Sequence, residues 1–240
     1  MIETLTWWAA AELVGAIAFP IAFVFFHGLP DRGYAFSKAI GLLLLSYSLW
    51  IGATLGLFPS ARGSIILIMA LLAILSAVLA GRYRQELSAF LRNGRAYMML
   101  VEGLFFSIFV LAVFLRSFVP DIQWGEKPFE FAFVNAINRS ELFPPDDPWL
   151  SGHSISYYYF GYLIASTLTK LTGLATSITF YLTLSLVAAL AASAIFGLVY
   201  NLLASARTST ERPLTAARSF MPRAAIFGLV GVGLLLLLSN

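Results

Sequence analysis

The sequence predicts an all-α fold, a polytopic bundle of transmembrane helices, from three observations. Apolar residues make up 60% of the 240 residues and charged residues only 11%. The mean hydropathy of +0.85 lies outside the range of soluble globular domains. The apolar residues form continuous runs of the length, about 20 residues, that crosses a hydrocarbon core of about 30 Å. Because these runs do not alternate with polar residues, they argue against a closed barrel.

The apolar runs predict about seven spans. The candidate spans are residues 5–26, 34–58, 64–80, 97–118, 156–171, 177–204 and 224–238. The chain then divides into a four-helix membrane region (1–118), an extracytoplasmic loop with an acidic and aromatic motif (119–155), and further transmembrane helices (156–240). The last apolar run has no polar flank, so we expect the chain to be the N-terminal portion of a longer protein.

The distribution of arginine predicts which loops are cytoplasmic. The loop after the third candidate span holds four arginines, Arg82, Arg84, Arg92 and Arg95. With this loop inside, the loop at 119–155 faces outward. One connection disagrees, because the basic stretch at 205–223 falls outside if every candidate span crosses. Either the rule fails locally, or the shortest candidate, 156–171, does not cross and the basic stretch returns to the cytoplasm.

Charge and cysteine content exclude several functions. The net charge is only +3, and the basic residues cluster in short connections between spans, so no nucleic-acid partner is expected. Without cysteine the chain has no disulfide, no thiolate nucleophile and no cysteine metal site. Any chemistry is expected in the outer loop, which holds six acids against Lys127 and Arg139.

The first candidate group in this loop is Glu126 and Glu130. The surrounding residues, 124–140, show helical spacing of apolar side chains and predict a short amphipathic helix at the membrane interface. The two carboxylates would share one face, where they could act as acid and base or bind a cation. The alternative is an acidic first turn that only stabilises its helix.

The second candidate group is Asp146 and Asp147 within the sequence PPDDPW. Flanking prolines hold the backbone extended and place the carboxylates on a stiff segment before Trp149. Paired carboxylates suit a divalent cation such as Mg or Mn, or deprotonation of an acceptor hydroxyl. An ordinary proline-rich turn with solvated acids is the alternative.

The third candidate group is His153 with the run Tyr157, Tyr158 and Tyr159. His153 could act as acid or base at neutral pH. Tyrosines entering the next span are typical of an aromatic belt. Three successive residues on a helix point about 100° apart, so at least one phenol should face protein or a cavity and could bind a sugar or phosphate.

Two acids lie inside apolar spans. Glu12 and Glu102 would each cost several kcal/mol at membrane depth unless paired or protonated. They predict contacts between helices or the lining of a cavity. A transporter is a third function to consider because of them, but no inverted repeat or paired broken helices support it.

Several blocks of sequence resemble the "YYY" family of polytopic membrane proteins of bacteria and archaea, named for a tyrosine run. The blocks are LPDRGYAFSKAIGLLLL (29–45), GEKPFEFAFVNAINRS (125–140), FPPDDPWLSG (143–152), ISYYYFGYLIASTLTKLTG (155–173) and FGLVYNL (196–202). Members of this family are usually longer than this chain. They look like GT-C glycosyltransferases, which take a sugar from a polyprenyl-phosphate donor at the outer face of the membrane.

This resemblance implies a function and roles for the loop residues. Glu126, Glu130, Asp146 and Asp147 become the acidic candidates, and Lys127, Arg139 and His153 become available to the donor phosphate. In many GT-C enzymes the acidic loop follows the first span, whereas here it follows the fourth. The expected partners are membrane lipids, a polyprenyl-phosphate-linked sugar and further membrane subunits. The alternative function is a non-catalytic subunit or a lipid- or carbohydrate-binding scaffold of a larger complex.

Overall fold

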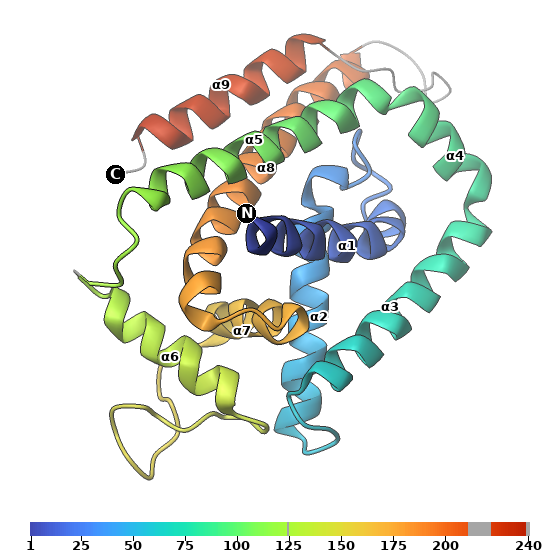
Figure 1. Cartoon of the computed structure of the whole chain (residues 1–240). Coiled ribbons are helices and arrows are strands. Elements are labelled where there is room, and N and C mark those ends of the chain that lie inside the picture. The colour runs from blue at the N-terminus through green and yellow to red at the C-terminus, as the bar shows by residue number, and fades with distance from the viewer. Residues whose placement is uncertain (124, 211–221, 239–240) are drawn as a thin grey trace.

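The computed structural model describes residues 1–123, 125–210 and 222–238, and these ranges form helices without a strand (Figure 1). One isolated β-bridge joins Asp146 and Ser154. The protein is therefore an all-α membrane helical protein, as its composition predicts. The helices are α1 (Ile2–Phe25), η1 (Tyr34–Phe36), α2 (Ser37–Thr54), α3 (Arg62–Arg82), α4 (Arg84–Asn93), α5 (Arg95–Ser117), α6 (Lys127–Arg139), α7 (Phe160–Thr172), α8 (Thr176–Thr210) and α9 (Pro222–Leu238).

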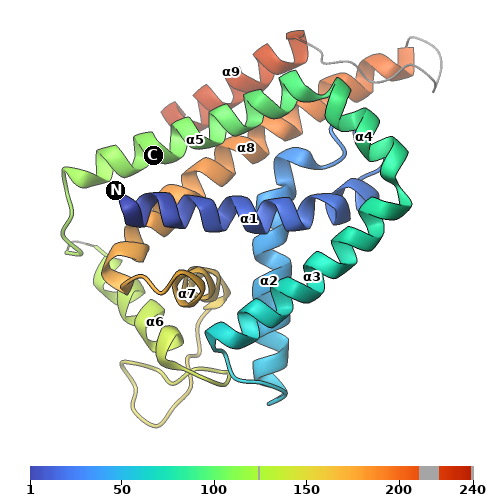
Figure 2. The same cartoon turned by 45° about the vertical axis from the view of Figure 1, so that its right-hand side comes forward.

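The long helices run between two ends of the molecule (Figures 1 and 2). We call the end formed by residues 55–61 and 118–175 the acidic end. The end formed by residues 26–36 and α4, together with the last turns of α8 and the first of α9, is the basic end. Helices α5 and α8 pack along one another. Arg116 near the end of α5 lies over Tyr181 near the start of α8, so these two helices are antiparallel.

Within the described residues, fewer helices are long and apolar enough to cross a membrane than the roughly seven spans that the sequence predicts. Five segments of the described chain are long and apolar enough to cross a membrane, and the 17-residue α9 is shorter. The candidate span at 156–171 is replaced by α7, whose 13 residues extend only about 20 Å, too short for a core of about 30 Å. Residues 156–159 are not helical.

Helix α7 lies across the acidic end, because both of its ends contact that end. Leu163 packs with residues of α6, and Lys170 near the other end bonds to Ser60 in the α2–α3 loop. The last turns of α8 then reach the same end of the bundle as α4, since the Tyr200 ring lies 4.4 Å from that of Tyr97 at the start of α5. The alternative in which 156–171 does not cross is the one that the structure supports.

The revised span count removes the conflict in the charge distribution. Helix α8 ends and α9 begins at the basic end, the end that also holds the arginines of α4. The predicted basic residues Arg212 and Arg218 lie outside the described residues. The polar connections of the two ends thus differ in sign, which is the pattern of a membrane protein with one orientation.

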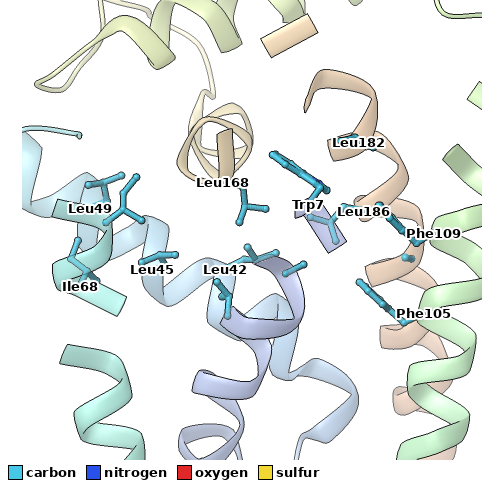
Figure 3. Close-up of a cluster of buried hydrophobic side chains, with 14 residues drawn as sticks. Trp7, Leu42, Leu45, Leu49, Ile68, Phe105, Phe109, Leu168, Leu182 and Leu186 are labelled. Carbon is cyan, nitrogen blue, oxygen red and sulfur yellow. The ribbon is translucent and has the colours of Figure 1, made fainter. Parts of the chain in front are cut away.

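A continuous apolar core joins α7 to the long helices (Figure 3). Leu168 of α7 points toward Leu42 and Leu45 of α2, and Trp7 of α1 completes the cluster. Helices α1 and α2 approach closely at Gly41, where an added Cβ would lie 2.6 Å from the carbonyl oxygen of Val14. This core holds α7, and with it the acidic end, in a defined position.

The two intramembrane acids are paired, as the cost of burying a charge requires. Lys38 Nζ lies 2.6 Å from a Glu102 oxygen and 3.2 Å from Glu12 Oε2. Tyr34 donates a further hydrogen bond to Glu102 at 2.8 Å. Gly15 leaves the room for the lysine stem, because a Cβ there would lie 2.6 Å from Lys38 Cγ. The acids therefore join α1, α2 and α5.

Candidate functional site

Helix α6 carries the first candidate acids, and its local sequence sets its limits. Glu126 occupies the N-cap position, Pro128 follows in the first turn, and Ser140 is the C-cap. Proline suits the first turn because that turn's N–H groups lack helical partners. The predicted helix is present, but its apolar face packs against protein, since Phe133 and Ile137 are buried with α7.

Polar bonds between helices fix α6 further. Thr176 at the start of α8 donates to Asn135 Oδ1 at 2.8 Å. Ser166 of α7 donates to Asn138 Oδ1 at 3.2 Å. Hydrogen bonds between buried polar groups are directional, so they hold the helix in one rotation. The Glu130 side chain then lies at the edge of the face that packs on α7, where it meets Tyr162, and Glu126 is exposed at the N-cap.

The structure brings Glu126 and Glu130 beside the tyrosine run. Tyr162 of α7 donates toward Glu130 Oε1 at 3.5 Å. Tyr157 donates to the hydroxyl of Tyr158 at 2.5 Å, and this bond is the largest cause that raises the pKa of Tyr157 to about 12; both carboxylates raise it further. Burial, and then the charge of Glu130, raises the pKa of Tyr162 to about 12. At neutral pH these phenols are donors beside carboxylates.

Exposed aromatic rings border these groups. The ring of Phe129 stacks on Trp149 at 6.0 Å and meets Tyr157 edge-on at 5.8 Å. Trp149 is 62% exposed and Tyr158 75% exposed. We call Glu126, Phe129, Glu130, Trp149, Tyr157, Tyr158 and Tyr162 the aromatic-carboxylate surface. Flat rings beside carboxylates can stack on the apolar face of a sugar while the acids accept from its hydroxyls.

The third tyrosine of the run points elsewhere. Tyr159 accepts a hydrogen bond from Trp50 Nε1 of α2 at 2.8 Å, and its ring stacks on Phe143 at 6.2 Å. The prediction that the three tyrosines follow one another on a helix is wrong, because α7 begins only at Phe160. The backbone of residues 156–159 is not helical, and it places Tyr157 and Tyr158 at the surface and Tyr159 against Trp50 and Phe143.

The second candidate acids line a separate cavity. It has a volume of about 530 Å³ and is bordered by Arg139, Glu141, Asp146, Asp147 and several prolines. Asp147 Oδ1 accepts from the backbone N–H groups of Trp149 and Leu150, which supports the turn interpretation for this residue. Asp146 is exposed. The described residues contain no cluster of three or more acids, histidines or cysteines. A cation here would therefore be held by these two carboxylates together with backbone, water or ligand oxygens.

The remaining predicted residues lie at the edges of these two groups. His153 is exposed, and its backbone oxygen accepts from Asp147 N–H at 2.8 Å, which closes the loop between them. Lys127 is half-buried in the first turn of α6. Among the residues that border the cavity, Arg139 supplies the positive charge. The predicted residues thus form two groups around α6 rather than a single centre.

Sequence patterns missed Lys170, which joins three segments. Its ammonium donates to the backbone oxygens of Ser60 and Ser140, at 2.5 and 2.9 Å, so the α2–α3 loop, α6 and α7 meet at one side chain. Burial lowers the pKa of Lys170 to about 8, and the charge of Glu141 opposes the shift. A lysine near a helix end carries no sequence signal that separates this role from an exposed one.

These observations define a class, an α-helical integral membrane protein whose acidic and aromatic side chains gather at one end of the bundle. The family model described as "Uncharacterized membrane protein (DUF2298)" matches residues 44–240. The chain belongs to this family. The match covers α6, α7 and both groups of candidate residues. No curated protein and no solved structure matches the chain.

Proposed function

We propose that this protein is a membrane glycosyltransferase of the GT-C type. It transfers a sugar from a polyprenyl-phosphate donor at the outer face of a prokaryotic cell membrane. The observation that carries the proposal is the aromatic-carboxylate surface, where Glu126 and Glu130 lie beside phenol donors and exposed rings. The resemblance to the "YYY" family supports the choice of donor.

The proposed reaction is a displacement at the anomeric carbon of the donor sugar. A carboxylate of α6, Glu126 or Glu130, accepts the proton of an acceptor hydroxyl while that oxygen attacks the anomeric carbon. The bond between that carbon and the phosphate oxygen breaks, and the lipid phosphate leaves with the electron pair. Arg139 and Lys127 supply positive charge for the departing phosphate, and His153 is available to hydrogen-bond it.

The second group of residues would serve the phosphate side of the reaction. Asp146 and Asp147 would hold a divalent cation, which would supply charge stabilisation for the phosphate. Trp149 and Tyr158 would stack on the sugar. The Tyr162 phenol would keep the Glu130 carboxylate oriented through its hydrogen bond. The Tyr158 hydroxyl, which accepts from Tyr157, would donate its own proton to a sugar hydroxyl.

The test is sugar transfer by the purified protein in lipid nanodiscs. The probes are radiolabelled polyprenyl-phosphate mannose and glucose, with an added oligosaccharide acceptor. Glu126→Gln and Glu130→Gln are compared with Glu86→Gln, which removes an exposed acid of α4 at the basic end. Loss of a general base predicts a decrease of about 10²–10⁴-fold in kcat for at least one α6 variant and no change for the control. Equal rates in all variants would contradict the proposal.

The alternative is a scaffold that binds carbohydrate or lipid without transfer. The exposed rings of Trp149 and Tyr158 favour this alternative, because stacking on a carbohydrate requires only exposed rings. In that case Trp149→Ala would weaken oligosaccharide binding, whereas Glu126→Gln and Glu130→Gln would alter subunit assembly and no transfer would be measured with any donor.

A further inference from the structure

A groove lies where α5 ends and α8 begins, apart from both groups of candidate residues. It has a volume of about 210 Å³, and its walls are mostly apolar. The lining residues that matter here are Val113 and Arg116 of α5, Pro120 beyond it, and Ser177, Tyr181 and Leu182 of α8. The groove therefore has one cation, Arg116, against otherwise uncharged walls.

The guanidinium of Arg116 lies over the ring of Tyr181, 5.2 Å from its centre. The Tyr181 hydroxyl donates to the backbone oxygen of Asp121, which fixes the ring. None of the ion pairs formed by the described residues involves Arg116. A cation held against a fixed ring and without a carboxylate partner favours an anionic ligand, and the first turn of α8 adds the positive end of a helix dipole.

The surroundings of the groove indicate where its ligand comes from. Large apolar side chains at the end of α5 are exposed, among them Phe114, Leu115 and Phe118. In a protein that spans a membrane such side chains face lipid, and a cation in the last turn of a span lies at the depth of the headgroups. The groove is thus open to molecules of the bilayer itself.

We propose that this groove binds an anionic phospholipid of the surrounding bilayer, with its phosphate on Arg116 and the upper part of one acyl chain along Val113 and Leu182. A zwitterionic headgroup is disfavoured, because its ammonium group would find no acid among the groove residues. Phospholipids surround this surface in large excess over any carrier lipid, which favours them by mass action. The proposal does not depend on glycosyl transfer.

The experiment measures lipid retained by the purified protein. Full-length protein is reconstituted in vesicles of equal parts phosphatidylglycerol and phosphatidylcholine, extracted in mild detergent, and examined by native mass spectrometry. Arg116→Gln is compared with Arg95→Gln, which removes an exposed arginine at the opposite end of the same helix. We expect retained phosphatidylglycerol to fall roughly tenfold for Arg116→Gln, the scale of one lost charge-assisted contact, and to stay unchanged for Arg95→Gln.

A second variant keeps the test decisive if Arg116→Gln fails to fold. Ser177→Trp fills the groove and leaves the arginine in place, and it should also lower retained phosphatidylglycerol. Equal retention by Ser177→Trp and the unaltered protein, or equal retention of both phospholipids, would overturn the proposal. Displacement of phosphatidylglycerol by an equimolar amount of undecaprenyl phosphate would also overturn it and would assign the groove to a carrier lipid.

Discussion

At the scale of single residues, Lys170 has an environment that its sequence position does not suggest. It is half-buried among backbone oxygens of the α2–α3 loop and the end of α6. Burial lowers its pKa from 10.5 to about 8. Between these two values the unfolded chain binds more protons than the folded one, so the free energy of unfolding rises with pH over this range.

This sign gives a measurable pH dependence. The apparent Tm should rise from pH 8 to pH 10, by about 2–4 °C for each kcal/mol gained. Above pH 10 the tyrosines act in the opposite direction, because the pKa values of Tyr157 and Tyr162 are raised to about 12 and the unfolded chain loses those protons first. Thermal unfolding of Lys170→Met in nanodiscs is the control, and its Tm should be flatter over the same interval. An equally steep rise in that variant would assign the dependence to other groups.

The sequence singles out the candidate residues, but the way they group in space could not be predicted from it. The carboxylates stand out because a bilayer disfavours charged side chains. Their partners depend on the backbone of residues 156–159, which is not helical and which divides the tyrosine run between the surface and Trp50. Lys170 and Tyr162 lie inside a mostly apolar stretch whose sequence favours a span, so only the folded arrangement shows their contacts.

At the scale of elements, the close packing of α1 on α2 supports the helices that pack against this pair. Gly41→Ala should lower the free energy of unfolding by about 1–3 kcal/mol, the usual cost of overpacking. Its Cβ would lie 2.6 Å from the backbone oxygen of Val14 and 2.8 Å from Val14 Cγ1, and a helix backbone cannot move aside alone. Denaturant titration of the protein in mixed micelles measures the change.

Gly103→Ala is the matched control, a helical glycine of α5 with nothing within 4 Å of an added Cβ. Relief of the glycine penalty should leave the stability unchanged or raise it by up to about 1 kcal/mol. A Gly41→Ala protein as stable as Gly103→Ala would show that the two helices do not approach as described.

The sequence predicts a helix correctly where an apolar run is clear. It fails at 156–171, where the length of the run does not decide whether the segment crosses the membrane. The apolar runs at 5–26, 34–58, 64–80, 97–118 and 177–204 predict α1, α2, α3, α5 and α8. The 16 residues at 156–171 are compatible with a short span, but the helix begins only at Phe160, whose ring packs on Trp50 of α2. Helix α6 was predicted from its spacing, but its partner, α7 rather than lipid, was not.

At the scale of the whole molecule, α7 determines which parts of the chain share a side of the membrane. With α7 lying across the acidic end, both candidate groups and the lipid groove lie at that end. Helix α4 and the start of α9 lie together at the other end. The distribution of arginine does not decide the side of the basic stretch at 205–223, because counting 156–171 as a span moves that stretch to the opposite side of the membrane.

Cysteine accessibility tests this arrangement most directly, since the natural chain has no cysteine. Single variants Ser151→Cys, Gln85→Cys and Arg223→Cys place one thiol each in the acidic-end loop, α4 and the first turn of α9. A membrane-impermeant maleimide applied to intact cells should label Ser151→Cys alone, and the other two should react only after the membrane is opened. Labelling of Arg223→Cys together with Ser151→Cys in intact cells would mean that α7 crosses the membrane, and would contradict the account.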